Sequence, residues 1–178
     1  MKTNPPFQRI CVMGNSGSGK STLANALSEK YQLPAFHLDR ELLYGQFNPH
    51  PLEKQLAIHD KIIKQDKWVI DGAYKQLIPA RIKRAELVIF LNISRKTIIP
   101  RVVKRYIFNT NREHTVPSEA KNALSLNFLF ILLKHSRKKK LQTLQETIKQ
   151  EHPGLPLLVL NKDTLEHWLT AVEKFGAR

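Results

Sequence analysis

The most constraining feature of this 178-residue sequence is an eight-residue loop pattern. Residues 14–21 read Gly-Asn-Ser-Gly-Ser-Gly-Lys-Ser and match G-x-x-x-x-G-K-[ST], a loop whose backbone N–H groups surround phosphate oxygens. The apolar run at 9–13 predicts a buried strand before it, and apolar residues at helical spacing predict a helix over 20–30. The alternative is a glycine-serine turn that matches the pattern by accident, and such a turn would not need a strand before it and a helix after it. The sequence therefore predicts that the chain binds a nucleoside triphosphate.

Each residue type in the loop has a physical role. Glycines let the backbone amides approach phosphate oxygens closely, and Lys20 can reach the β- and γ-phosphates. The Ser21 hydroxyl is placed to coordinate Mg²⁺, so ATP and Mg²⁺ are the predicted ligands. The candidate nucleotide-binding residues of the loop are Gly14, Asn15, Ser16, Gly17, Ser18, Gly19, Lys20, Ser21 and Thr22.

Length and composition indicate one globular domain over residues 1–178. Apolar residues make up 42% of the chain, but the longest apolar stretch, at 128–133, is far below the ~20 residues that span a bilayer. The N-terminus has no apolar core of signal-peptide length, which favours a cytoplasmic protein with no membrane partner. The single cysteine, Cys11, is expected to be a small buried residue of the first strand.

Strand and helix patterns alternate along the chain, as in a parallel α/β sheet. The strands are expected at 9–13, 35–38, 68–70, 87–91 and 157–160, and the helices at 20–30, 52–65, 95–108 and 164–174, with one or two more before about 151. Most strands are near-continuous apolar runs, which is typical of strands covered on both faces. Ligands then belong at the carboxyl ends of the strands.

Two segments interrupt this alternation. We expect 40–51 to be an insertion on the acceptor side and about 106–140 to be a basic lid, with an ordinary helical hairpin as the alternative for the second. The net charge is +14, and residues 101–140 hold ten Lys or Arg against two acids. Such a region can attract nucleotide phosphates or nucleic acid, or it can be a solvated basic face.

Carboxylates follow two of the predicted strands. Asp71 ends an apolar strand, where an acid can hold Mg²⁺ directly or through water, although it could also only cap a turn. Asp39 could orient an acceptor hydroxyl or act as its base. His37 lies inside the strand pattern and is interpreted as a packed or hydrogen-bonded structural residue rather than a catalyst.

Arginines provide further candidates. Arg101 and Arg105 are spaced i, i+4 on one helix face and could clamp phosphate or stack on a base, or else cover a helix flank. Arg81 and Arg84 form a second pair on the acceptor side. The alternative is that they are ordinary surface arginines, which are common.

These motifs together carry a family resemblance. The chain resembles the adenylate-kinase-like P-loop proteins and, more narrowly, the topology modulation protein family. The matching segments are Gly14–Thr22, His37-Leu38-Asp39, Trp68–Tyr74, Val88–Leu91, the Arg101/Arg105 helix and Leu158–Leu160. The resemblance implies a three-layer α/β/α P-loop NTPase fold, with a five-stranded parallel sheet in the order 2-3-1-4-5 and a helical lid insertion. It also implies that Arg101 and Asn161 lie near the adenine and Arg105 near the phosphates.

The favoured function is a Mg²⁺-dependent kinase that transfers the ATP γ-phosphoryl group to a nucleoside, nucleotide or other small hydroxylated acceptor. Lys20, Asp39, Arg101 and Arg105 are its candidate catalytic residues, and Ser21 and Asp71 its candidate metal ligands. AMP is a poor acceptor candidate, because Ala-Tyr-Lys follows Asp71-Gly72 where adenylate kinases have Phe-Pro-Arg. The alternative is a nucleotide-dependent regulator that binds nucleic acid through 101–140, with a steep salt dependence.

Overall fold

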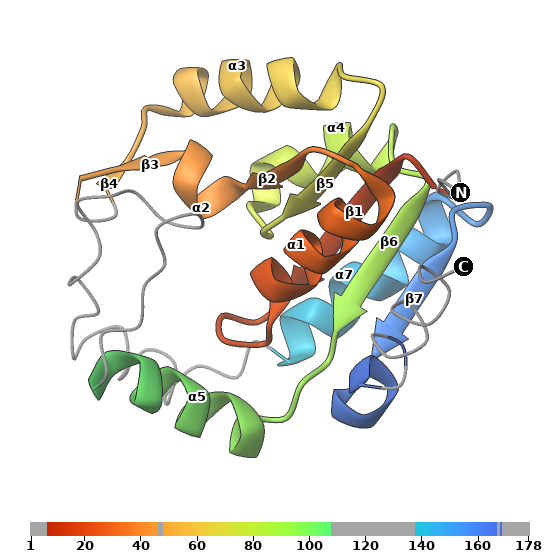
Figure 1. Cartoon of the computed structure of the whole chain (residues 1–178). Coiled ribbons are helices and arrows are strands. Elements are labelled where there is room, and N and C mark those ends of the chain that lie inside the picture. Colours follow the sequence, from red (N-terminus) through yellow and green to blue (C-terminus); the bar gives the residue numbers. More distant parts are fainter. Residues whose placement is uncertain (1–6, 46–47, 108–137, 167, 169–178) are drawn as a thin grey trace.

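The fold is built on a parallel sheet of five strands. The computed structural model describes residues 7–45, 48–107, 138–166 and 168, without the side chains of 105–107, 138 and 139. The strands are β1 (Arg9–Gly14), β2 (Ala35–His37), β5 (Trp68–Asp71), β6 (Leu87–Leu91) and β7 (Leu157–Leu160). Their order is β2-β5-β1-β6-β7 (Figure 1). The predicted α/β fold class and the order 2-3-1-4-5 are therefore confirmed.

Helices and one short hairpin connect the strands. The helices are α1 (Lys20–Tyr31), α2 (Leu38–Glu41), α3 (Leu52–Ile63), α4 (Ile78–Ile82), α5 (Arg95–Ile107) and α7 (Lys138–Glu151), with a 3₁₀ turn η1 (Lys75–Leu77). Residues 162–166 are also helical. The predicted insertion at 40–51 contains β3 (Leu43–Tyr44) and β4 (Asn48–Pro49), which pair antiparallel.

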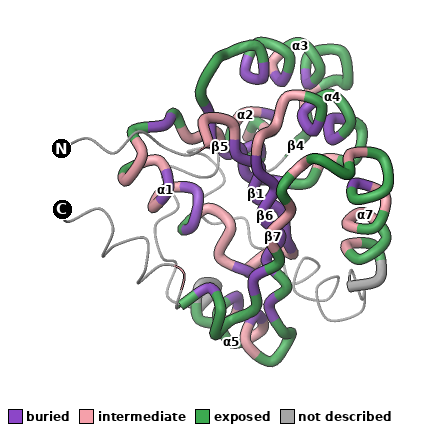
Figure 2. The backbone as a smooth tube through the Cα atoms, turned by 90° about the vertical axis from the view of Figure 1, so that its right-hand side faces the viewer, coloured by how far each residue is buried: buried purple, intermediate pink, exposed green. Residues whose placement is uncertain are grey.

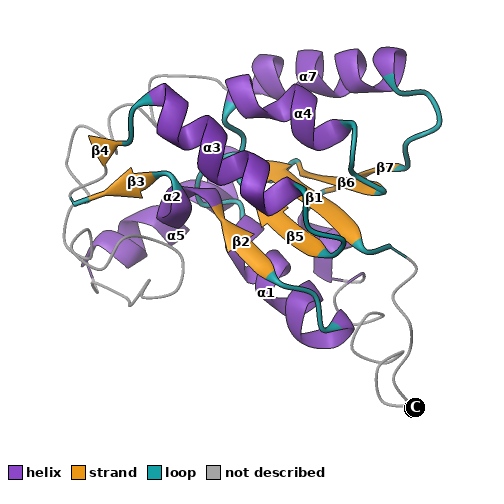
Figure 3. Ribbon diagram, turned by 90° about the horizontal axis from the view of Figure 1, so that it is seen from above, coloured by secondary structure: helices purple, strands orange, loops and turns teal. Residues whose placement is uncertain are grey.

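Helices cover both faces of the sheet, so the molecule has three layers. Figure 3 shows α3, α4 and α7 on one side of the sheet and α1 on the other. Alternate residues of β1 point to opposite faces of the sheet. Ile10 and Val12 belong to the apolar cluster that includes Leu23 of α1, whereas Cys11 and Met13 belong to the cluster that includes Ile62 of α3. Each face of the sheet therefore has its own apolar core.

The central strands are almost completely excluded from solvent. Figure 2 shows buried residues concentrated in the sheet and exposed residues on the outer sides of the helices. Trp68 and Phe90 are both 0% exposed. Cys11 is equally buried, as expected, and burial raises the pKa of its thiol to about 11. A thiol in this environment is not a nucleophile at neutral pH.

The structure corrects two expectations on the acceptor side. β2 ends at His37, and Leu38, predicted as the last strand residue, instead begins α2. Asp39 therefore lies in a helical turn, where its charge is favourable near the helix N-terminus. Arg81 is not a surface residue: it is 0% exposed, and its Nη2 donates a hydrogen bond to the Gly72 carbonyl oxygen at 2.9 Å. This hydrogen bond from Arg81 therefore stabilises the turn after β5.

The central part of the predicted basic lid, 108–137, lies outside the described residues. Among the residues described, none of the helices is long and apolar enough to cross a membrane. The same residues contain no group of three or more His, Cys, Asp or Glu side chains arranged to hold a metal ion.

A buried histidine makes the stability of this fold sensitive to acid. His59 of α3 is 0% exposed, and burial together with the nearby charge of Arg81 lowers its pKa from 6.5 to about 4. Below pH 6.5 the unfolded chain binds a proton at this residue that the folded protein does not. Stability should therefore fall by about 1.4 kcal/mol per pH unit between pH 6.5 and 4 from this group alone. Denaturant unfolding of wild type and His59→Leu across this range measures the effect, and parallel pH profiles would contradict it.

Candidate functional site

The glycine-rich loop connects the end of β1 to the start of α1, as its sequence predicts. Two glycines have left-handed backbone angles that other residues rarely adopt: Gly17 with φ 78° and Gly19 with φ 96°. Gly19 is the N-cap of α1, where no side chain caps the helix and no acid lies in the first turn. The first amides of α1 and the positive end of its dipole therefore remain available to an anion.

Polar atoms inside the loop fit a phosphate-binding role. The Lys20 ammonium donates a hydrogen bond to the Asn15 carbonyl oxygen at 3.0 Å, so its charge lies back over the loop. Within the described part of the chain, the Ser18 hydroxyl is buried without a hydrogen-bond partner, and it can donate to a phosphate oxygen. Unpaired buried polar groups are costly. Such a loop is suited to an added polyphosphate.

The predicted metal ligands also have suitable chemistry. Asp71 is the last residue of β5, is 4% exposed, and pairs in register with Val12 of β1, two residues before the loop. Its Oδ2 atom has no hydrogen-bond partner among the described residues. Ser21 lies in the first turn of α1. Because Mg²⁺ prefers oxygen ligands and keeps several waters, one carboxylate and one hydroxyl are an adequate protein contribution.

Asp39 is held by a tyrosine from a neighbouring loop. Tyr74, three residues after β5, donates a hydrogen bond from its hydroxyl to Asp39 Oδ1 at 2.9 Å. Burial, followed by the negative charge of Asp39, raises the pKa of Tyr74, so this hydroxyl keeps its proton and remains a donor. The contact joins the segments after β2 and β5. Asp39 itself is exposed and can be reached by a small molecule.

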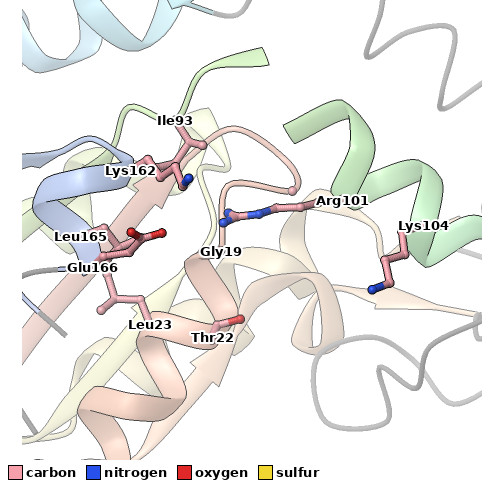
Figure 4. A pocket seen from close by; sticks show the side chains of 10 residues that line it. Gly19, Thr22, Leu23, Ile93, Arg101, Lys104, Lys162, Leu165 and Glu166 are labelled. Atoms are coloured by element: carbon pink, nitrogen blue, oxygen red, sulfur yellow. The ribbon is translucent and has the colours of Figure 1, made fainter. Parts of the chain in front are cut away.

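A pocket of about 380 Å³ extends from the loop toward the end of β7 (Figure 4). It is lined by Gly17, Gly19, Thr22 and Leu23 near the start of α1, Arg101 and Lys104 of α5, Ile93, and Lys162, Leu165 and Glu166. The Arg101 side chain extends from α5 toward Gly19 (Figure 4). The pocket thus has basic side chains near the phosphate loop and an apolar wall at Leu23, Ile93 and Leu165.

The predicted residues have different positions relative to this pocket. Arg101 and Thr22 line it. Asn161 instead caps the following helical residues, because its Oδ1 accepts a hydrogen bond from the Thr164 amide at 2.9 Å. The side chain of Arg105 lies outside the described set. Six lining residues were not candidate site residues: Leu23, Ile93, Lys104, Lys162, Leu165 and Glu166. Of these, Lys104 could have been predicted, because it follows Arg101 by three residues on the same helix.

Known proteins resemble this chain in sequence and in fold. The chain is 29% identical over 126 residues to an adenylate kinase of Encephalitozoon cuniculi (strain GB-M1), which covers 56% of this chain and 67% of the relative. The shikimate kinase structure from Bacteroides thetaiotaomicron has a TM-score of 0.53 at 18% identity, covering 95% of this chain and 96% of that one.

A protein from Chloroflexus aurantiacus has a TM-score of 0.55 at 13% identity, covering 93% of this chain and 94% of that one. These two structures share the fold. The family model described as an AAA domain, AAA_18, matches residues 10–116, which is more than half of the chain. The chain therefore belongs to the AAA_18 family of AAA domains, and its fold is that of the P-loop kinases.

Proposed function

We propose that this protein is a Mg²⁺-dependent kinase that transfers the γ-phosphoryl group of ATP to a small hydroxylated acceptor, such as a nucleoside or nucleotide. The main support is the continuity of the phosphate loop with a pocket of about 380 Å³ that begins at Gly17 and Gly19. That volume is within the range of small-molecule sites. The similarity to an adenylate kinase supports the same reaction class, and the narrower resemblance to topology modulation proteins remains part of the proposal.

The nucleotide side of the proposed site uses residues around α1 and α5. The loop amides and Lys20 bind the β- and γ-phosphates. Arg101 approaches these phosphates from α5, rather than the adenine as the family resemblance implies, because its side chain is directed toward Gly19 (Figure 4). The base then lies against Leu23, Ile93 and Leu165. When bound to Ser21 and Asp71, Mg²⁺ would supply positive charge next to the phosphates.

The acceptor side lies beyond the ends of β2 and β5. Asp39 accepts a hydrogen bond from Tyr74 at 2.9 Å, which fixes one carboxylate oxygen and leaves the exposed side chain able to receive an acceptor hydroxyl. Nearby, the rings of Tyr44 and His50 stack with centroids 4.9 Å apart across the β3–β4 hairpin. Asp39 would orient the hydroxyl, so that catalysis is mainly positioning and charge neutralisation.

The proposal extends to the domain organisation and cellular location of the protein. Residues 1–178 would form one kinase domain in the cytoplasm, with 40–51 on the acceptor side and about 106–140 as a lid. Lys20, Asp39, Arg101 and Arg105 would be the catalytic residues.

The test is a product assay with ATP, Mg²⁺ and a panel of nucleosides, nucleotides and small hydroxylated metabolites. We expect one acceptor class to gain the mass of a phosphoryl group, with an equal amount of ADP formed. Asp39→Asn should lower the rate of this transfer more than the affinity for ATP, because Asp39 lies on the acceptor side. ATP that binds but phosphorylates nothing in the panel, with or without Mg²⁺, would contradict the kinase proposal.

A further inference from the structure

Three polar side chains link the helix of the phosphate loop to the proposed metal carboxylate. His37, at the end of β2, has its Nε2 atom 2.9 Å from Asn25 Oδ1 on α1. Its other ring nitrogen, Nδ1, lies 3.2 Å from Asp71 Oδ2 on β5. The imidazole therefore stands between Asn25 and Asp71, and contacts both.

Strand register explains why these side chains meet. His37 pairs in register with Asp71, and Asp71 pairs with Val12, all in parallel strands. Residues paired in this way present their side chains on the same face of a sheet. Val12 belongs to the core cluster that includes Leu23 of α1, so this is the face that α1 covers. The contact with Asn25 follows from the packing of α1 on that face.

Burial makes the contact between the ring and the carboxylate important. His37 is 6% exposed and Asp71 is 4% exposed, so little water reaches either side chain. The 3.2 Å contact at Asp71 Oδ2 does not have hydrogen-bond geometry, and this oxygen has no other partner among the described residues. The Asn25 amide can present either oxygen or nitrogen to Nε2, so the ring can keep a proton on Nδ1, facing the carboxylate.

We propose that His37 is a positioning residue that holds the Asp71 carboxylate in place relative to α1, and that it thereby determines how strongly Mg²⁺ promotes nucleotide binding. The inference rests on the proposed function, in which Asp71 contributes to the Mg²⁺ site. Residues that orient a metal ligand typically change metal affinity 10- to 100-fold when they are replaced. His37 touches neither metal nor phosphate in this arrangement, and acts through Asp71.

Two substitutions of similar size separate the two contacts of the ring. The amide nitrogen of asparagine lies close to the position of Nδ1, so His37→Asn keeps an N–H group facing the Asp71 carboxylate. The amide of glutamine reaches nearer to Nε2, so His37→Gln can keep the Asn25 contact and lose the Asp71 contact. Both variants are measured by calorimetric titration with ATP, in the presence of Mg²⁺ and in excess chelator, after circular dichroism has confirmed folding.

We expect His37→Gln to reduce the Mg²⁺-dependent gain in ATP affinity about tenfold, while its affinity in chelator stays within about threefold of wild type. His37→Asn should retain most of the gain. The matched control is His59→Gln, which replaces another buried histidine, on α3, and should preserve the full gain. A purely structural role for His37 would instead weaken ATP binding equally with and without Mg²⁺.

The outcomes distinguish the inference from the function on which it rests. If Mg²⁺ strengthens ATP binding to wild type and to His37→Gln by the same factor, the positioning role is wrong and the proposed function stands. If Mg²⁺ does not change the ATP affinity of wild type, the inference is wrong, and the product assay alone decides the proposed function. If His37→Gln does not fold, the His37→Phe variant, which keeps the ring shape, is measured in its place. His37→Phe is likewise expected to lose the Mg²⁺-dependent gain about tenfold, and an undiminished gain would overturn the inference.

Discussion

Replacing Lys20 by alanine is expected to lower phosphoryl transfer about 10²- to 10³-fold, with little change in protein stability. The Lys20 ammonium lies over the loop, 3.0 Å from the Asn15 carbonyl oxygen, at the first residue of α1. A positive charge fixed there stabilises the negative charge that develops on the phosphates, and removal of one such group commonly costs this much in rate. Steady-state kinetics with the acceptor identified in the product assay measure the effect.

Lys104→Ala is the matched control for Lys20→Ala, because it removes a lysine that lines the pocket beside the loop but lies on α5, farther from the loop. We expect it to lower the rate less than tenfold. Denaturant midpoints of both variants should remain close to that of wild type, since neither side chain is in an apolar core. Equal losses of rate in the two variants would mean that general positive charge, rather than the loop lysine, supports the reaction.

The parts of the fold that the sequence predicted well depend on local patterns. The predicted strands at 68–70 and 87–91 are uninterrupted apolar runs, and the loop at 14–21 has a fixed spacing. Such signals need no knowledge of the rest of the chain. The short helix α2 and the η1–α4 segment were not predicted, because four or five residues do not establish a helical period.

Contacts between distant segments explain what was missed in the site. His37 was interpreted as a structural residue because it lies inside a strand pattern. Its contact with Asp71 depends on β2 and β5 being neighbours in register, which the spacing of residues along one strand does not reveal. Arg81 was expected either in a pair on the acceptor side or at the surface, and its burial was missed for the same reason: it depends on how α4 packs against the turn at Gly72.

Replacing Gly17 by alanine is expected to weaken ATP binding at least tenfold and to destabilise the fold by about 1–3 kcal/mol. The residue has a φ of 78°, and a Cβ atom would lie 2.7 Å from Val102 Cγ2 and 3.1 Å from Ile98 Cγ2. Both neighbours are on α5, so the alanine must either push α5 away or distort the loop. Either movement displaces amides that bind phosphate or shifts Arg101, which lies on the same helix.

Three further variants separate steric crowding from backbone strain. Gly19→Ala has the strain alone, because its φ is 96° and nothing lies within 4 Å of the added Cβ. Gly154→Ala introduces neither crowding nor backbone strain, so its ATP affinity and stability should match those of wild type. Val102→Ala combined with Gly17→Ala removes the closest contact, so ATP affinity should recover until only the strain remains. ATP titrations and denaturant midpoints measure all four proteins. If the double variant binds ATP no better than Gly17→Ala, crowding against α5 is not the cause, and the loop conformation alone accounts for the loss.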